Sequence, residues 1–267
     1  KGIQNGDEWT FIAETYGEYT LTGTLGTLTA SATVTVDAVK QYRETLAFYS
    51  DNFALNDWAT IASVINNGIN PETWKVGDVK KIESGDLAGE EAHIRIIGKN
   101  HDTYVDGGKA PYTFMLYISD RVTSDALDRP MQSEGNVTDG WQSTDMYKTY
   151  VPEIRNLLPS EFRTNLKYII KNSVTGDYRN GTQQIKAMHE LNCLLAKVEI
   201  DGTTENFYAT EGEQYEFFKN GNSAPRYSWT RTQKEGDDRF METDNNGVVS
   251  MAALNSNERA ATMCFCL

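Results

Sequence analysis

The alternation of apolar and polar residues is most regular near the N-terminus. From Leu28 to Val36, each second residue is leucine, alanine or valine, and the residues between are threonine or serine. A period of two is that of a β-strand with one face against a core. Shorter runs rich in threonine and aromatic residues, at 9–13, 18–22 and 42–49, predict further strands. They are separated by residues that favour turns, namely Gly17, Gly23, Gly26 and Asp37. Residues 1–50 are therefore expected to form a small all-β, sandwich-like module.

A helical pattern begins after residue 50. Trp58, Ile61, Ala62 and Ile65 follow the spacing of one helix stripe, Asn56 is placed to cap the helix, and Gly68 is placed to end it. This change of pattern predicts a second domain over residues 51–267.

The rest of the second domain mixes helical and strand patterns. Residues 147–158 predict a helix that kinks or restarts at Pro152 and that Pro159 ends. Ser160 is expected to cap another helix, which would carry Phe162, Leu166, Ile169 and Ile170. Strands are predicted within 71–82 and at 93–98, 112–118, 194–200, 215–218, 227–230, 239–243 and 263–267. The fold class expected is α+β.

Charge and cysteine content narrow the range of partners. Asp and Glu number 38 against 25 Lys and Arg, which gives a net charge of -13. Such a chain has no basic surface to neutralise phosphates, so nucleic acid is not expected as a partner. Neither a membrane-inserting run nor a signal peptide is recognised. Three cysteines, an odd and small number, predict no disulfide framework and leave the redox compartment open.

Several short segments after residue 50 occur in a recurring order. They are residues 58–65 (WATIASVI), 74–79 (WKVGDV), 96–102 (IIGKNHD), 108–114 (GKAPYTF), 141–146 (WQSTDM), 157–159 (LLP), 211–218 (EGEQYEFF), 229–231 (WTR) and 264–267 (CFCL). In this order the chain resembles an uncharacterised domain family of gut bacterial and phage proteins. The resemblance covers about residues 50–267.

This resemblance implies a C-type-lectin-like domain, similar in its Trp-Arg strand and closing strand to sulfatase-modifying enzymes and phage receptor-binding proteins. Some such proteins are the variable products of diversity-generating retroelements. The module before it is similar to immunoglobulin-like modules of phage structural proteins. The implied function is ligand or receptor binding on a virion or on an extracellular or cell surface. The implied partner is a protein or glycan receptor on a bacterial cell, with homo-oligomers within a virion as a further expectation.

The candidate binding residues lie near the C-terminus. Trp229 and Arg231 alternate on a predicted strand, so they share a face and would offer a stacking surface with a forked donor. A core tryptophan with a salt-bridged arginine is the alternative. The polar stretch 233–257 suits a displayed surface, or else simple turn chemistry around Gly247. The ligand-binding residues predicted are Trp229, Arg231, Gln233, Asp237, Asp238, Arg239, Met241, Thr243, Asn245, Asn246, Asn255 and Asn257.

Other candidate chemistry has a plainer interpretation. Asp237, Asp238 and Asp244 could supply oxygens to calcium, but their spacing matches no EF-hand, and neither a metal nor a cofactor is expected. The neighbours His101 and Asp102 predict a structural pair in a loop, because histidines at metal-binding spacing are missing.

Cys264 and Cys266 share a face of the last strand, where core packing is the favoured interpretation. No catalytic residue is predicted. Two alternatives to a binding protein stay open: a virion decoration or fibre protein without a host ligand, and an enzyme on a sulfatase-modifying-like fold that uses these cysteines or His101.

Overall fold

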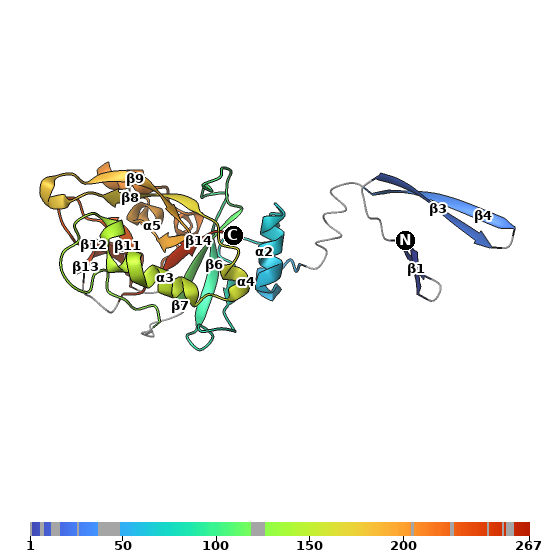
Figure 1. The fold of residues 1–267 in the computed structure, drawn as a ribbon, viewed down its shortest axis with the longest axis horizontal. Helices are drawn as coiled ribbons and strands as arrows, with labels where there is room; N and C mark the ends of the chain where they lie inside the picture. Colours follow the sequence, from blue (N-terminus) through green and yellow to red (C-terminus); the bar gives the residue numbers. More distant parts are fainter. Residues whose placement is uncertain are drawn as a thin grey trace. The chain divides into compact units, whose positions relative to one another are not determined.

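The computed structural model contains helices and strands in comparable measure. It describes residues 2–5, 8–11, 17–25, 27–36, 49–118, 126–203, 206–224, 227–244, 246–252, 254 and 259–267. The chain divides into two compact units, Lys1–Tyr49 and Ser50–Leu267 (Figure 1). With 22% helix and 34% strand in several small sheets, the fold is mixed α and β.

The described strands of the first unit form two antiparallel pairs. These are β1 (Gly2–Asn5) with β2 (Glu8–Phe11), and β3 (Gly17–Leu25) with β4 (Leu28–Val36). The strand predicted from the alternating pattern is thus confirmed over its whole length.

Two expectations for this unit were wrong. Gly23 lies inside β3, paired with Ala30, and does not form a turn. The apolar face of β4 is not buried, since Leu28 is 73% and Val34 36% exposed. A two-stranded ribbon has no second layer of its own to cover a face. Of the strand predicted at 42–49, all but Tyr49 lies outside the described residues.

The second unit is built around a five-stranded antiparallel sheet. Its strands, in spatial order, are β10 (Asn192–Leu194), β14 (Met263–Phe265), β7 (Tyr112–Ile118), β6 (Ala92–Lys99) and β5 (Val79–Lys81). The C-terminal strand β14 therefore lies between β10 and β7, so the chain end is part of the core. All seven residues of β7 are buried, as its continuous apolar run predicts.

One face of this sheet carries an aromatic cluster. Phe114 on β7 and Phe265 on β14 are cross-strand partners with ring centroids 6.2 Å apart. Phe162 packs edge-on against both, at 5.7 and 5.1 Å. Phe53, from the short helix η1 (Phe53–Leu55), stacks on Phe114 at 6.0 Å. Large aromatic areas removed from water make this cluster the main apolar core of the unit.

The helix predicted after residue 50 is α2 (Trp58–Asn66), which lies beside α4 (Ser160–Arg163) (Figure 1). Trp58 contacts Phe162 of α4. Its cap is Asp57, which accepts the Thr60 amide at 2.7 Å. Asn56 was predicted to cap the helix, but its side chain instead bonds the backbone of residues 50, 52 and 53.

The second predicted helical region contains a π-helical turn, η3 (Met146–Tyr150), followed by α3 (Val151–Asn156). Pro152 lies in the first turn of α3, where its missing amide hydrogen is tolerated. The restart at Pro152 is confirmed.

The helix predicted from Ser160 to Ile170 was largely wrong. Only α4 forms, and Ile169 begins the strand β8 (Ile169–Thr175), which pairs with β9 (Gln184–Glu190). The apolar residues that fit a helical spacing here belong to two different elements, the short helix α4 and the strand β8.

The predictions after residue 191 were partly correct. The sheet of β11 (Ser228–Gln233), β12 (Phe240–Thr243) and β13 (Val249–Ala252) contains the strands predicted at 227–230 and 239–243. The strands predicted at 194–200 and 215–218 were wrong, because these segments mainly form the short helices α5 (Lys197–Asp201) and α6 (Glu216–Lys219). Short apolar runs do not distinguish a strand from one buried helical turn.

The aromatic cluster generates the first prediction. Phe114→Ala is expected to lower the free energy of unfolding by about 3–5 kcal/mol, because it removes a ring from a fully packed position and leaves a cavity. Urea unfolding of the full chain, followed by tryptophan fluorescence, measures this loss. The control is Leu55→Ala at a side chain that is 74% exposed, where a change within about 0.5 kcal/mol is expected. Equal losses in both variants would contradict the central role of Phe114.

Candidate functional site

The opposite face of the central sheet carries polar and sulfur-containing side chains. Because side chains alternate along a strand, Thr113 points away from the Phe114 face, and Cys264 points away from the Phe265 face. Cys193 lies directly across from Cys264, with the two sulfur atoms 3.7 Å apart. These residues are buried, so whatever covers this face has to supply partners for polar atoms.

Asp102 supplies the partner of Thr113, and it belongs to a group of four charged side chains that cover this face. Lys171 Nζ lies 2.7 Å from Asp102 Oδ1 and 2.7 Å from Glu199 Oε1. Glu199 Oε2 in turn lies 2.6 Å from Arg231 Nη1. Each of the four residues is 5% exposed or less. Two acids and two bases therefore form a buried, charge-balanced chain of ion pairs, which we call the ionic network.

Each member of the ionic network comes from a different part of the chain. Asp102 follows β6, Lys171 is on β8, Glu199 is on α5 and Arg231 is on β11. The backbone holds the first two together, since the Ile170 amide donates to the Thr103 carbonyl at 2.9 Å. The network thus joins elements that are distant in sequence.

Hydroxyl groups complete the surroundings of Asp102. Its Oδ2 accepts hydrogen bonds from Thr113 Oγ1 at 2.5 Å and from Tyr215 Oη at 2.8 Å. Burial alone would raise the pKa of Asp102, but the Lys171 ammonium and hydrogen bonds from its neighbours lower it well below its usual range. Burial would likewise lower the pKa of Lys171, but Asp102 and Glu199 raise it above its usual value. The pair is therefore held in its charged form.

Tyr215 is close to the network because residue 98 is glycine. A Cβ at Gly98 would lie 2.9 Å from Tyr215 Cδ1. The pairing of β6 with β7 shifts by one residue between Ile96 and Gly98, as at a β-bulge. This local irregularity lets the Tyr215 ring approach the backbone that leads to Asp102.

Arg231 is fully satisfied by its neighbours. Besides Glu199, its guanidinium donates to the carbonyl oxygens of Leu194, Asn172 and Glu211 at 2.8, 3.2 and 3.1 Å. The expectation that Arg231 is displayed to a ligand is wrong, because it has no exposed surface. The alternative of a core arginine in an ion pair is the one that the structure adopts.

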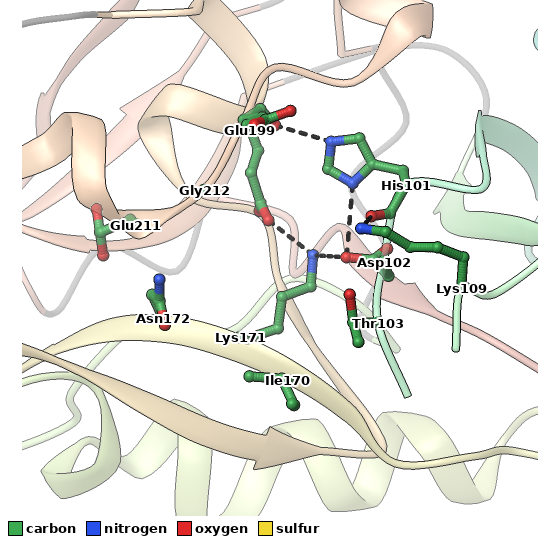
Figure 2. A pocket seen from close by; sticks show the side chains of 11 residues that line it. His101, Asp102, Thr103, Lys109, Ile170, Lys171, Asn172, Glu199, Glu211 and Gly212 are labelled. Atoms are coloured by element: carbon green, nitrogen blue, oxygen red, sulfur yellow. Dashed lines mark hydrogen bonds and ion pairs between the residues drawn. The ribbon is translucent and has the colours of Figure 1, made fainter. Parts of the chain in front are cut away.

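A pocket of about 360 Å³ opens beside the ionic network. Figure 2 shows Lys171 between Glu199 and Asp102, with His101 beside Asp102. The His101 ring stacks on Tyr215 with centroids 3.9 Å apart, and its Nδ1 lies 3.6 Å from Asp102 Oδ1. The pocket is lined by His101, Asp102, Thr103, Lys109, Ile170, Lys171, Asn172, Glu199, Glu211, Gly212 and Glu213.

Glu211 lines this pocket, and one oxygen of its carboxyl group lacks a hydrogen-bond partner. It is 1% exposed, its Oε2 accepts from Thr232 Oγ1, and its Oε1 has no hydrogen-bond partner. Burial raises its pKa to about 7. Burial also raises the pKa of Glu190, at the end of β9, to about 7. Both acids hold their protons more tightly in the folded chain than in the unfolded chain.

All three cysteines are buried and free. Cys266 Sγ lies 3.6 Å from Thr113 Oγ1 and 3.9 Å from Asp102 Oδ2, on the same face as Cys264. Burial is the larger cause that raises the pKa of the Cys266 thiol, with Asp102 adding to it. A neutral thiol in such a place behaves as a small apolar group, as the core-packing interpretation expects.

The predicted ligand-binding residues divide into buried and accessible groups. Trp229, Gln233, Met241 and Thr243 are buried, as is Arg231, and the expectation that they form a displayed surface is corrected. They belong to β11 and β12, whose side chains here pack inward. Trp229 Nε1, for example, donates to the Arg129 carbonyl at 2.8 Å.

The accessible members of the predicted set lie in the turns. Asp237, Asp238, Arg239 and Asn246 retain accessible surface, whereas Asn245, Asn255 and Asn257 lie outside the described residues. Asp237 pairs with Arg239, and Asp244 accepts the backbone amides of residues 246 and 248, which is turn chemistry. Over the described ranges, no three His, Cys, Asp or Glu side chains gather so that they could hold a metal ion.

Three exposed apolar side chains near these turns were missed by the sequence analysis. Tyr227, Val248 and Met251 are 46, 59 and 41% exposed. Ser228 pairs with Thr243, which pairs with Val249, so Tyr227 and Val248 extend from the same end of the sheet. We call Tyr227 and Val248 the apolar patch. Met251 lies three residues after Val248, within β13, so its side chain points to the other face of the sheet. The sequence contains one signal for such a residue, since Val248 directly follows the polar turn residues 244–247.

Comparison with known proteins returned no match to a family model, a curated protein or a solved structure. Within the described part of the chain, no helix has the length and apolar character needed to span a bilayer.

The raised pKa of Glu211 predicts a pH dependence. A carboxyl group with a pKa of 4.5 when unfolded and about 7 when folded stabilises the fold below pH 4.5, and this stability is lost as the pH rises through about 7. Glu211→Gln, which mimics the protonated acid, should therefore flatten the decline in unfolding free energy across this window. Urea unfolding at a series of pH values measures it.

Glu190→Gln is the matched variant, because Glu190 is the other carboxyl group with a raised pKa. This substitution should remove the contribution of Glu190 to the pH dependence of the unfolding free energy. The double variant should have the flattest profile of the four proteins. A profile for Glu211→Gln that is parallel to the wild type would show that this acid does not titrate in the expected window.

Proposed function

We propose that the chain is a non-catalytic recognition protein of a phage particle or bacterial surface. The first unit would be an immunoglobulin-like spacer and the second a C-type-lectin-like domain. The ligand would be a protein or glycan on a bacterial cell, bound at the apolar patch and the adjoining polar turns. This proposal keeps the C-terminal location expected from the sequence and replaces the buried residues with their exposed neighbours.

The proposal rests on the contrast between the exposed apolar patch and the buried strand β11 next to it. The β11 strand is buried along its whole length, yet Tyr227 directly before it is 46% exposed. Arg239 and Asn246 add polar, exposed side chains in the turns around β12. An apolar centre with a polar surround on a rigid support is the usual anatomy of a protein recognition surface.

Tyr227 is also held in place before any ligand binds. The Arg259 guanidinium lies over its ring, 4.9 Å from the centroid, and Arg259 is paired with Glu242 on β12. An anchor that is already ordered loses little conformational entropy on binding.

Binding is favoured over catalysis by the state of the charged residues at the pocket. The acids and bases of the ionic network are bonded to one another, so they leave no free nucleophile and base pair for a substrate. The cysteines that an enzyme on a sulfatase-modifying-like fold would use are buried.

The proposal is tested by binding of the labelled full chain to a panel of bacterial cell envelopes. The double variant Tyr227→Ser and Val248→Ser should bind at least ten-fold more weakly, since each buried anchor contributes about 1 kcal/mol or more. Leu55→Ser, at a more exposed apolar residue outside the patch, is the control and should bind like the wild type.

Two results would contradict this proposal. Equal binding by the double variant and the wild type would remove the patch from the binding surface. A wild-type chain that binds no envelope, while it assembles into particles, would favour a virion decoration or fibre protein without a host ligand.

If the chain is a retroelement variable protein, the structure predicts where variation falls. Gene copies sequenced from the source population should differ at codons for exposed positions such as Asp238, Arg239, Val248 and Met251. Buried Trp229, Arg231, Gln233 and Thr243 should stay constant, because changes there would disrupt packing. Variation spread evenly over buried and exposed positions would contradict a diversified surface.

A second candidate function is the binding of a small polar ligand in the pocket. The observation in its favour is Glu211 Oε1, which is buried without a hydrogen-bond partner in the pocket wall. A hydroxyl or ammonium group of a ligand would satisfy it. Weaker envelope binding by Glu211→Gln, with unchanged binding by the double patch variant, would place the ligand in the pocket.

A further inference from the structure

We propose that Lys171 and Asp102 condense to form an intramolecular amide bond, with Glu199 relaying a proton between them. The product would be an isopeptide cross-link between the loop after β6 and strand β8. It would form once in each folded chain, so it is a self-modification and not a turnover reaction. It does not depend on the ligand-binding proposal.

The first support is the arrangement of the three reacting groups. Lys171 Nζ contacts one oxygen of Asp102 and one oxygen of Glu199, each at 2.7 Å. The two segments that carry the future bond are already joined by the Tyr104–Ile169 bridge and the Ile170 to Thr103 hydrogen bond. Groups held at contact distance by a folded backbone react as if at a very high local concentration.

The step is balanced without any other reactant. One proton first passes from the Lys171 ammonium to Asp102 Oδ1, which converts the charged pair into a neutral amine and a neutral acid. After the nitrogen has attacked, Glu199 carries a second proton from the nitrogen to Oδ1. The nitrogen lone pair forms a bond to Asp102 Cγ, and the bond from Cγ to Oδ1 breaks. Oδ1 leaves as water with the two protons, and the amide nitrogen keeps one. The adjacent pocket, which Asp102, Lys171 and Glu199 all line, gives this water a way out.

The second support is the environment of the other Asp102 oxygen. Oδ2 accepts hydrogen bonds from the hydroxyl groups of Thr113 and Tyr215. When nitrogen attacks Cγ, negative charge develops on Oδ2, and two donors already aimed at it stabilise that charge. Oδ1, by contrast, faces the ammonium group that delivers the protons.

The third support is charge. Before the reaction, two carboxylates and two cations occupy a site that is almost closed to water. Burial of each ion carries a cost, which its partners offset only in part. Condensation removes the charges of Lys171 and Asp102 together and leaves the Glu199–Arg231 pair, which is itself balanced. The product therefore keeps neutrality with fewer buried ions.

The chain contains its own negative control. Lys197 and Asp201 also form a Lys–Asp ion pair, but their side chains are 18 and 24% exposed and lie on consecutive turns of α5. Water there hydrates both ions, and the burial that favours condensation is missing. A cross-link is expected at Lys171 and not at Lys197.

The test is the intact mass of the purified, denatured full chain. The expected mass is lower than the sequence mass by one water molecule, in essentially all molecules. Lys171→Arg and Asp102→Ala should restore the mass expected from their sequences, whereas Lys197→Arg should keep the deficit. Glu199→Gln should slow or abolish the loss of water. The wild-type measurement decides the question even if a network variant fails to fold.

Peptide mapping locates the bond. Trypsin should release a branched peptide that joins residues 100–109 to residues 168–179, because an acylated Lys171 is not cleaved. A wild-type chain with the full sequence mass, and with normal cleavage after Lys171, would overturn the proposal. A water loss that maps to any other pair of residues would overturn it as well.

Discussion

Burial of charge without water is the constraint on which the second unit depends. Asp102, Lys171, Glu199 and Arg231 would each cost several kcal/mol to bury alone, and the fold tolerates them because each has an oppositely charged partner at hydrogen-bond distance. Removal of one partner leaves an uncompensated ion, which typically costs about 3–5 kcal/mol. The four residues come from separate elements, so this requirement fixes the loop after β6, β8, α5 and β11 relative to one another. Hydrophobic contacts alone are non-directional and would not impose such exact positions.

The same constraint explains why the central sheet has two different faces. The Phe114 face is covered by aromatic rings, which pack well in several orientations and need no polar partner. The opposite face carries small polar or sulfur-containing groups such as Thr113 and Cys266, which leave room for the ionic network and supply it with a hydroxyl donor. A larger apolar residue at Thr113 would both fill this space and leave Asp102 with one donor fewer.

The sequence predicted the elements whose pattern is long and regular. β4 and α2 were assigned correctly because a period of two or of 3.6 over nine residues is distinctive, and only the capping residue of α2 differed. β7 was assigned correctly from its continuous apolar run. The strand expected at 194–200 failed because a few buried apolar residues fit one turn of α5 equally well. The ionic network could not be predicted, since its members are isolated polar residues whose contacts depend on the complete fold. Asp102, Tyr215 and Arg231 lie in three separate short segments of the sequence, at 96–102, 211–218 and 229–231.

Trp229 and Arg231 show the limit of pattern analysis for a binding site. A period of two correctly indicates that alternate residues share a face, but it does not say whether that face is covered. Here β8 and α5 cover it, so the residues suited to display are those just beyond the strand ends. Their orientation then depends on β11, and β11 is held by the pairing of Arg231 with Glu199. An ion pair weakens when its carboxylate is protonated, whereas an amide bond does not titrate. A cross-link at Lys171 would therefore keep the loop after β6 and strand β8 in register under conditions that loosen the Glu199–Arg231 pair.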